Sequence, residues 1–146
     1  MKKLLLILLC LPMIGFGQNV NIPDANFKAN LVGNITINTN GDAEIQVSEA
    51  IAFNGYINCG TSNISDLTGI EAFTSLTILR CNQNQLTSLD VSQNIALTTL
   101  ECWSNSLTNL DVSTNTFLTY LDLGGNQLIN INLNQNTALT ELRCWD

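Results

Sequence analysis

The sequence predicts a mostly β solenoid that carries a small helical cap at its N-terminal end. Two observations support this fold class. First, a 21-residue phrase that starts at Leu76 returns at Leu97 and Leu118, and a shortened copy starts at Leu139. Self-similarity at a fixed period near 20 residues is typical of stacked repeats, which bury their apolar faces only against their neighbours. Second, residues 18–53 do not repeat and contain short helical patterns instead.

Each 21-residue unit contains the same sub-phrase twice, at half-steps of 10 and 11 residues. In the unit that starts at Leu97, Leu100 and Cys102 alternate with polar residues in the first half, and Leu110 and Val112 do so in the second. Alternation with period 2 predicts strands, and neither half has room for a helix of ~10 residues and its turns. We therefore expect two short strands per coil, stacked into two parallel sheets around a thin apolar core.

The repeats begin before the regular copies. Residues 54–75 form a divergent first coil, in which Ile57 and Cys59 match Leu79 and Cys81 of the next. The repeat region is therefore 54–146, with coils that start near positions 54, 76, 97, 118 and 139, the last one incomplete.

Aligned asparagines mark two corners of each coil. One column contains Asn84, Asn105 and Asn126, and the other contains Asn94, Asn115 and Asn136. A corner leaves backbone amides and carbonyls unpaired, and a buried Asn side chain can satisfy both kinds of group. We interpret both columns as scaffold.

The nested pattern, LxxLxLxxN followed by LxxLDLxxN, resembles the leucine-rich-repeat superfamily and in particular its 21-residue bacterial class. The resemblance covers residues 54–146, where four coils keep register. The whole chain is similar to repeat proteins exported by flavobacteria and their relatives. This resemblance implies a curved solenoid that recognises a protein or a glycan without catalysis.

The segment before the repeats predicts a short helix over residues 22–32. Pro23 lies near its start, Phe27 and Leu31 share one face, and Gly33 ends it.

The next segment matches the spacing of an EF-hand calcium loop. Its ligand positions 1, 3, 5, 7 and 12 would be filled by Asn38, Asn40, Asp42, Glu44 (through its backbone carbonyl) and Glu49. The match departs from the motif at position 1, where Asp is usual, and at position 6, where Ala43 replaces the glycine of the sharp turn. The loop is therefore either a weak calcium site or an EF-hand-shaped turn held by Asn and Asp hydrogen bonds. In both cases it is similar to the EF-hand-like caps of internalin-type repeat proteins, and such a cap covers the apolar edge of the first coil.

Residues 1–17 are typical of a secretory signal peptide. Lys2 and Lys3 precede an apolar stretch over residues 4–13, and small residues precede the expected cleavage site before Gln18. A lipid-attachment role for Cys10 is the weaker alternative, because a large residue precedes it. The stretch is too short to span a membrane. We expect a chain that is secreted or displayed at the cell surface, without membrane insertion.

The charge balance excludes several classes of partner. Without the signal peptide, three cations face twelve carboxylates, so the chain repels nucleic acid and anionic lipid. The sequence contains no His, no glycine-rich phosphate loop and no nucleophile with a partner base. We therefore expect no enzymatic activity.

The cysteines of the repeats share one inward slot. Cys59, Cys81, Cys102 and Cys144 occupy it, and Leu123 takes the same slot in the fourth coil. Exchange between Cys and Leu indicates that Cys acts as a small hydrophobe, so we expect a ladder of buried thiols. A strained disulfide between neighbouring coils, Cys59–Cys81 or Cys81–Cys102, is an alternative, and a metal site is a weaker one.

The outward slots of the first sheet vary from coil to coil, and recognition is expected there. The candidate ligand-binding residues are Tyr56, Arg80, Glu101, Trp103, Tyr120, Asp122, Arg143 and Trp145. The alternative is structural: the aromatic rings would pack across neighbouring strands, and Arg80–Glu101 and Asp122–Arg143 would form cross-strand ion pairs.

We therefore expect a secreted, non-catalytic module that recognises an extracellular protein or a cell-surface glycan. The rival interpretation is a structural spacer of a larger adhesin-like protein, with no ligand of its own. The fifth copy stops at Asp146 and would leave an unpaired strand edge, which predicts either a truncated sequence or edge-to-edge self-association.

Overall fold

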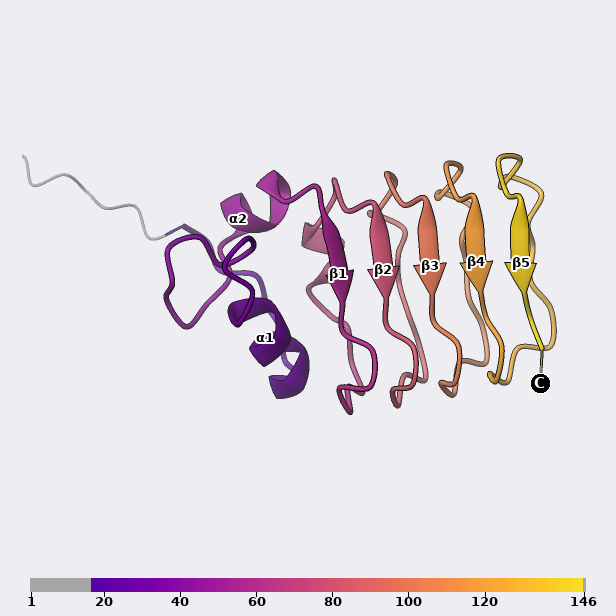
Figure 1. The fold of residues 1–146 in the computed structure, drawn as a ribbon, viewed down its shortest axis with the longest axis horizontal. Helices are drawn as coiled ribbons and strands as arrows, with labels where there is room; N and C mark the ends of the chain where they lie inside the picture. Colours follow the sequence, from indigo (N-terminus) through magenta and orange to yellow (C-terminus); the bar gives the residue numbers. More distant parts are fainter. Residues whose placement is uncertain (1–16, 146) are drawn as a thin grey trace, which may run out of the picture.

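Five short strands lie side by side in one parallel sheet, with the cap at the β1 end (Figure 1). The computed structural model describes residues 17–145. The strands are β1 (Tyr56–Asn58), β2 (Ile78–Arg80), β3 (Thr99–Glu101), β4 (Tyr120–Asp122) and β5 (Glu141–Arg143). Apart from Gly17, the expected signal peptide lies outside the described residues, and so does Asp146.

The register of the sheet confirms the repeat alignment. Each strand pairs with the next at equivalent slots, so that Tyr56 lies opposite Ile78, and Ile57 opposite Leu79. The first outward row is Tyr56, Ile78, Thr99, Tyr120 and Glu141, and the second is Asn58, Arg80, Glu101, Asp122 and Arg143. The middle residue of each strand points inward, and those of β1 to β4 are buried.

The expectation of two strands per coil is wrong for the described residues, because the second half of the first coil contains a short 3-10 helix, η1 (Ile70–Ala72), and the second halves of the later coils form turns. The physical reason is local hydrogen bonding. The side-chain oxygens of Asp90 and Asp111 each accept a bond from the backbone N–H two residues later, at Ser92 and Ser113 (both 2.9 Å). Such Asx turns offer the backbone an alternative to a sheet ladder, and the N–H groups of Asn94 and Asn115 also bond carbonyls of their own coil, at Val91 and Val112 (both 3.0 Å). Apolar alternation survives in these halves because Leu110 and Val112 still point into the core.

Two columns of asparagine join successive coils, as the sequence predicts. Asn105 accepts a bond from the Leu86 N–H (3.1 Å) and donates to the carbonyl oxygens of Cys81 and Cys102 (3.1 and 2.9 Å). The second column only donates: the Asn115 amide bonds the carbonyls of Val91 and Asn94 (3.0 and 2.9 Å). Among the described residues, the side-chain oxygens of this column, in Asn94, Asn115 and Asn136, have no donor. The expectation that every such Asn satisfies both kinds of group therefore holds for the first column alone.

A column of threonines adds a third connection between the coils. Thr98 donates both its backbone N–H and its hydroxyl to the carbonyl of Thr77 (2.8 and 3.1 Å), and Thr119 does the same to Thr98 (2.9 and 3.1 Å). These bonds precede each strand and help to fix the spacing of the coils.

The cysteine slot is buried in the coils that precede Leu123. Cys59, Cys81 and Cys102 are fully buried, whereas Cys144 is exposed, and all four are free thiols in the structure. Burial raises the pKa of Cys59 and of Cys102 to about 12, and it raises the pKa of Cys81 as well. The three buried thiols pack as small apolar side chains.

The cap contains two short helices, α1 (Ala25–Val32) and α2 (Val47–Ala52). The helix expected over residues 22–32 begins only at Ala25, because Asp24 is its N-cap and accepts bonds from the N–H groups of Asn26 and Phe27 (2.9 and 3.0 Å). Phe27 and Leu31 are fully buried against the first coil. The residues before α1 pair with the cap loop through one isolated antiparallel bridge, in which Val20 N–H donates to the Ile45 carbonyl (2.8 Å).

No helix in the part of the chain that the structure describes is long and apolar enough to cross a membrane.

Candidate functional site

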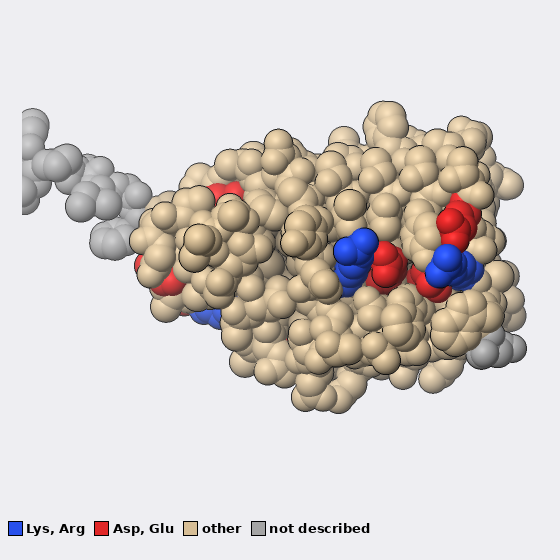
Figure 2. All heavy atoms as spheres, in the orientation of Figure 1, with Lys and Arg blue, Asp and Glu red and all other residues tan. Residues whose placement is uncertain are grey.

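The outward side of β1 to β5, with the residues that directly follow each strand, is called the sheet face below. Figure 2 views the molecule from this side and shows a short row of Arg, Asp and Glu side chains across it, surrounded by uncharged residues. The row belongs to the second outward column of the register and to Glu141. The candidate ligand-binding residues of the repeats therefore share one side of the sheet, although Asp122 is covered there.

The Arg80–Glu101 pair forms as predicted. Arg80 Nε donates to Glu101 Oε1 (2.8 Å) across β2 and β3. The Arg80 side chain is 42% exposed and the Glu101 side chain 21%, so solvent weakens the attraction. The pair fixes the orientation of the two side chains at the middle of the sheet face.

The predicted Asp122–Arg143 pair is wrong. Arg143 instead bonds Glu141 on its own strand, through Nε and Nη2 to Oε1 (2.9 and 2.7 Å). Residues two apart on a strand point to the same side, which brings these two together. The guanidinium carbon also lies 5.3 Å from the centre of the Tyr120 ring, within cation–π range.

Asp122 is buried and is not part of the accessible surface, being only 4% exposed. Its Oδ1 accepts a bond from the Gly124 N–H (3.2 Å). The Asp122 side chain is short and lies below the longer side chains around it. Its carboxylate stabilises the turn after β4 through the bond to Gly124. The sequence pattern placed it outward correctly but carried no information about this cover.

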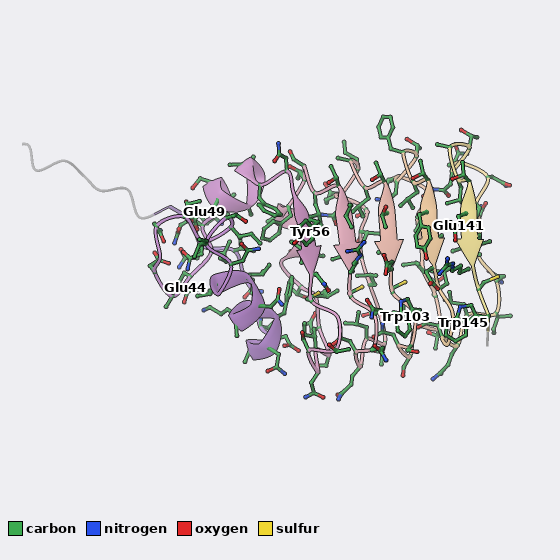
Figure 3. The ribbon with its side chains drawn as sticks, viewed as in Figure 1. Glu44, Glu49, Tyr56, Trp103, Glu141 and Trp145 are labelled. Carbon is green, nitrogen blue, oxygen red and sulfur yellow. The ribbon has the colours of Figure 1, made fainter. Side chains whose placement is uncertain are left out.

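Two tryptophans pack together beside this charged row. The ring centroids of Trp103 and Trp145 lie 6.3 Å apart, with an angle of 42° between the planes (Figure 3). Gly124 occupies the slot between them, and the Trp145 ring covers it: a Cβ on Gly124 would lie 2.6 Å from Trp145 Cε2. Trp145 is nevertheless 53% exposed. The aromatic rings thus both pack across the coils and remain accessible.

Burial raises the pKa of Tyr120, and the neighbouring carboxylates Asp122, Glu101 and Glu141 add to this, while Arg143 opposes it. The hydroxyl therefore stays protonated at neutral pH. This end of the sheet face therefore has two kinds of hydrogen-bond donor beside the aromatic ring: the neutral Tyr120 hydroxyl and the charged Arg143 guanidinium.

Tyr56 lies apart from this group. Figure 3 shows it on β1, at the cap end of the sheet, whereas Trp103 and Trp145 lie toward β5. It is 59% exposed. Beside it lies a hollow of about 400 Å³, lined by residues of the cap and of β1.

The EF-hand-like loop is held by its own hydrogen bonds. Glu49 Oε1 accepts from Thr39 N–H, Thr39 Oγ1 and Asn40 N–H (2.8, 2.9 and 3.2 Å), and Oε2 accepts from Gln46 N–H (3.0 Å). Burial alone would raise the pKa of Glu49, but these bonds outweigh it and lower the pKa. The carboxylate that would bind calcium at position 12 is therefore already supplied with donors.

The other candidate ligands have similar partners. Asp42 Oδ2 accepts from the side-chain amides of Asn40 and Gln46 (both 3.0 Å), and Glu44 forms an ion pair with Lys28 (2.6 Å). The Asn38 side chain spans the loop, donating to Asp42 O and accepting from Gly41 N–H. Within residues 17–145, no group of three or more His, Cys, Asp or Glu side chains is arranged to hold a metal ion. This donor set fits a hydrogen-bonded turn better than a calcium site.

Two contributors to the sheet face were missed at the sequence level. Glu141 stands in the first outward column, and its spacing of two from Arg143 was an available signal. Gly124 stands in one of the variable outward slots, and nothing in the sequence indicates that a tryptophan from another coil would cover it.

No family model matches the chain. Internalin J of Listeria monocytogenes serotype 4b (strain F2365) is 43% identical over 72 residues, which are 49% of this chain and 8% of that protein. The solved functional domain of InlJ from Listeria monocytogenes, described as including a cysteine ladder, is 42% identical with a TM-score of 0.76. It covers 87% of this chain and 28% of that one.

A solved internalin, inlF, from Listeria monocytogenes str. 4b F2365 is 19% identical with a TM-score of 0.69, over 89% of this chain and 46% of that one. At this identity the likeness concerns the fold alone. The chain thus spans less than half the length of each of these relatives. In its fold, the chain is an internalin-type leucine-rich-repeat solenoid.

Proposed function

We propose that this chain is an exported, non-catalytic recognition module whose sheet face binds an extracellular protein. The observation that carries the proposal is the cluster formed by Trp103, Trp145, Tyr120 and Arg143 at the β3–β5 end of that face. Trp, Tyr and Arg are the residues that most often contribute the binding energy of protein interfaces. The name internalin given to the similar proteins is consistent with a surface role, and export rests on the expected signal peptide.

The arrangement of the cluster favours binding, because its side chains are already positioned. Arg143 is held by Glu141 and by the Tyr120 ring, and Trp145 by Gly124 and Trp103. The chain then loses less side-chain entropy when it binds a partner than it would if these groups rotated freely.

The opposite side of the solenoid is a weaker candidate. Its turns expose Asp90, Asp111 and small polar residues whose side chains bond their own backbone. Small polar side chains of this kind are seldom among the residues that contribute most of the binding energy of an interface.

The proposal can be tested by probing an array of extracellular proteins and cell-surface glycans with the chain from residue 18 onward. We expect at least one protein to bind, and Trp103→Ala and Trp145→Ala each to weaken binding at least about tenfold. Phe117→Ala is the matched control, because this exposed aromatic side chain lies before β4 and outside the sheet face. Circular dichroism should show that all variants are folded.

Two results would refute the proposal. One is that the folded wild-type chain binds no protein on the array. The other is that a bound protein is equally insensitive to both tryptophan substitutions and to Phe117→Ala, which would place its site elsewhere.

A further inference from the structure

The hollow between the cap and β1 is built from uncharged groups. It measures about 400 Å³ and is lined by side chains of the segment after α1 and of β1, among them Asn34, Ile35, Tyr56 and Asn58, and by Asn30 of α1. Ile37 and Ile57, both 1% exposed, form its apolar floor. None of the residues that line it is ionisable apart from the tyrosine. A charged ligand would lose hydration there without gaining an opposite charge, so the hollow favours a neutral one.

Three asparagines are each held by one end of the side-chain amide. Asn30 donates through Nδ2 to the Asn58 carbonyl (3.1 Å), Asn34 accepts at Oδ1 from Thr36 N–H and Oγ1 (3.0 and 2.7 Å), and Asn58 accepts at Oδ1 from Gly60 N–H (3.2 Å). The other end of each amide, Asn30 Oδ1, Asn34 Nδ2 and Asn58 Nδ2, has no partner among residues 17–145. The asparagines that line the hollow therefore keep one acceptor and two amide groups with donor N–H that are not used within the protein.

An aromatic ring stands beside these amides. Tyr56 is 59% exposed and Ile35 is 85% exposed, so both present apolar surface to solvent at the edge of the hollow. Figure 3 shows Tyr56 at the cap end of the sheet, remote from the labelled tryptophans. Tyrosine combines a rigid apolar face with a hydroxyl, and asparagine supplies adaptable hydrogen bonds, a combination suited to binding a ligand with both apolar and polar faces.

We infer that this hollow is a binding site for a neutral sugar unit. A pyranose ring presents an apolar C–H face, which would stack on Tyr56, and hydroxyls that both donate and accept, which match the free ends of the three asparagine amides. The volume lies at the lower end of the range for small-molecule sites and suits one or two sugar units rather than a folded partner. This site is separate from the protein-binding cluster proposed above, since it lies at the other end of the sheet face.

The experiment is saturation-transfer-difference NMR on the chain from residue 18 onward, with chitobiose, lactose, maltose and mannobiose as probes. At least one neutral disaccharide should give a signal, with a Kd of about millimolar order. Tyr56→Ala should weaken its binding at least about tenfold, because the stacking surface is lost. Phe117→Ala is the matched control for loss of an exposed aromatic side chain and should leave the affinity unchanged, as should Trp103→Ala.

The site would be rejected if none of the four disaccharides binds the folded chain. It would also be rejected if binding persists in Tyr56→Ala. Loss of sugar binding in Trp103→Ala but not in Tyr56→Ala would place the sugar on the protein-binding cluster at the β3–β5 end and overturn this inference. Failure of the protein-binding proposal alone would leave the Tyr56-dependent sugar signal intact, so the two proposals fail independently.

Discussion

The ring centroids of Trp103 and Trp145 lie 6.3 Å apart, although a whole strand, β4, separates the strands that they follow. Two strand spacings amount to about 9.5 Å, so at least one ring must lean toward the other. Trp145 does so across Gly124, the one residue type that leaves room for it.

A substitution at Gly124 should separate the two rings. In Gly124→Ala the new Cβ would lie 2.6 Å from Trp145 Cε2, so the exposed Trp145 ring must move away. We expect a red shift of tryptophan emission and stronger quenching by acrylamide, with a change in stability within about 1 kcal/mol. Gly60→Ala is the matched control, because Gly60 has the same slot in the first coil but faces Asn82. Identical emission from wild type and Gly124→Ala would contradict the packing described here.

The two asparagine columns should differ in their contribution to stability. Asn105→Ala leaves the Leu86 N–H without an acceptor, although the carbonyls of Cys81 and Cys102 keep their bonds from Asn84 and Asn126. Asn115→Ala leaves no backbone group unsatisfied, because its two carbonyl partners also accept from backbone N–H groups, and it removes a side-chain oxygen that had no donor. Each buried group left unsatisfied costs about 1–3 kcal/mol. Both substitutions should lower the free energy of unfolding, Asn105→Ala by more. Urea denaturation measures the two free energies of unfolding. A larger loss in Asn115→Ala would show that the bond from the Leu86 N–H to Asn105 does not set the difference between the columns.

The buried thiols should be unreactive in the folded protein. Burial raises the pKa of Cys59 and Cys102 to about 12, so neither forms the reactive thiolate near neutral pH. In the chain from residue 18 onward, a thiol reagent at pH 8 should modify only the exposed Cys144 until urea is added. Rapid modification of two or more cysteines in the native protein would rule out the buried ladder.

The same thiols should make the fold sensitive to alkali. In the unfolded chain a thiol ionises near pH 8.5, whereas the folded state retains its proton until about pH 12. A pKa that is raised on folding contributes stability below the unfolded pKa, and this contribution is lost as pH rises toward the folded one. The urea midpoint should therefore fall between pH 8 and 11, and it should fall less steeply in Cys102→Ala.

Asp24 should make the cap sensitive to acid. Its Oδ1 caps α1, and its Oδ2 accepts from Ser65 N–H and Oγ and from Asp66 N–H (2.9, 3.0 and 3.3 Å), which ties the cap to the first coil. Burial opposes ionisation, but the bonds from Ser65, Phe27 and Asn26 outweigh it and lower the pKa. The resulting stability is present above the unfolded pKa near 4 and is lost as pH falls through the folded one.

Substitutions at Asp24 separate the effect of its charge from that of its hydrogen bonds at the N-terminus of α1. Asp24→Ala should cost about 1–3 kcal/mol in urea denaturation at pH 7. Asp24→Asn keeps a capping oxygen and should cost less, with a shallower loss of stability between pH 5 and 3. If the stability of Asp24→Asn falls as steeply between pH 5 and 3 as that of wild type, Asp24 is not the group that causes the acid sensitivity.

Calcium should have little effect on the cap. The oxygens of Glu49 and Asp42 already accept protein hydrogen bonds, and binding the ion would require several of these bonds to break. The melting temperature should therefore agree within about 1 °C between 1 mM calcium and excess chelator, concentrations at which weak extracellular calcium sites respond. A clear rise with calcium, abolished in Glu49→Gln, would restore the calcium interpretation.

The sequence and the structure differ most where the same local pattern can lead to two outcomes. Leu110 and Val112 show the alternation of a strand as clearly as Leu100 and Cys102, and both pairs are buried. Only the first half becomes a strand, because its backbone N–H groups bond the next coil, as Cys81 N–H does to Glu101 O, whereas in the second half Asn115 N–H bonds Val112 O of its own coil and Asp111 bonds its own backbone. The sequence shows Asp111, but whether its carboxylate bonds water or the backbone depends on the backbone conformation, which this bond itself helps to stabilise.

By itself, the sequence determined the coil period, the inward and outward slots and the Arg80–Glu101 pair, because strictly periodic residues in stacked coils must fall into columns. Only the tertiary structure decided that Arg143 bonds Glu141, that Asp122 is covered, and that Trp145 reaches Trp103. It also created the hollow at Tyr56, where α1 and the segment that follows it lie beside β1. The physical reason is that a repeat fixes where each Cβ points, whereas long side chains and the docking of the cap depend on which neighbours leave space and free hydrogen-bonding groups.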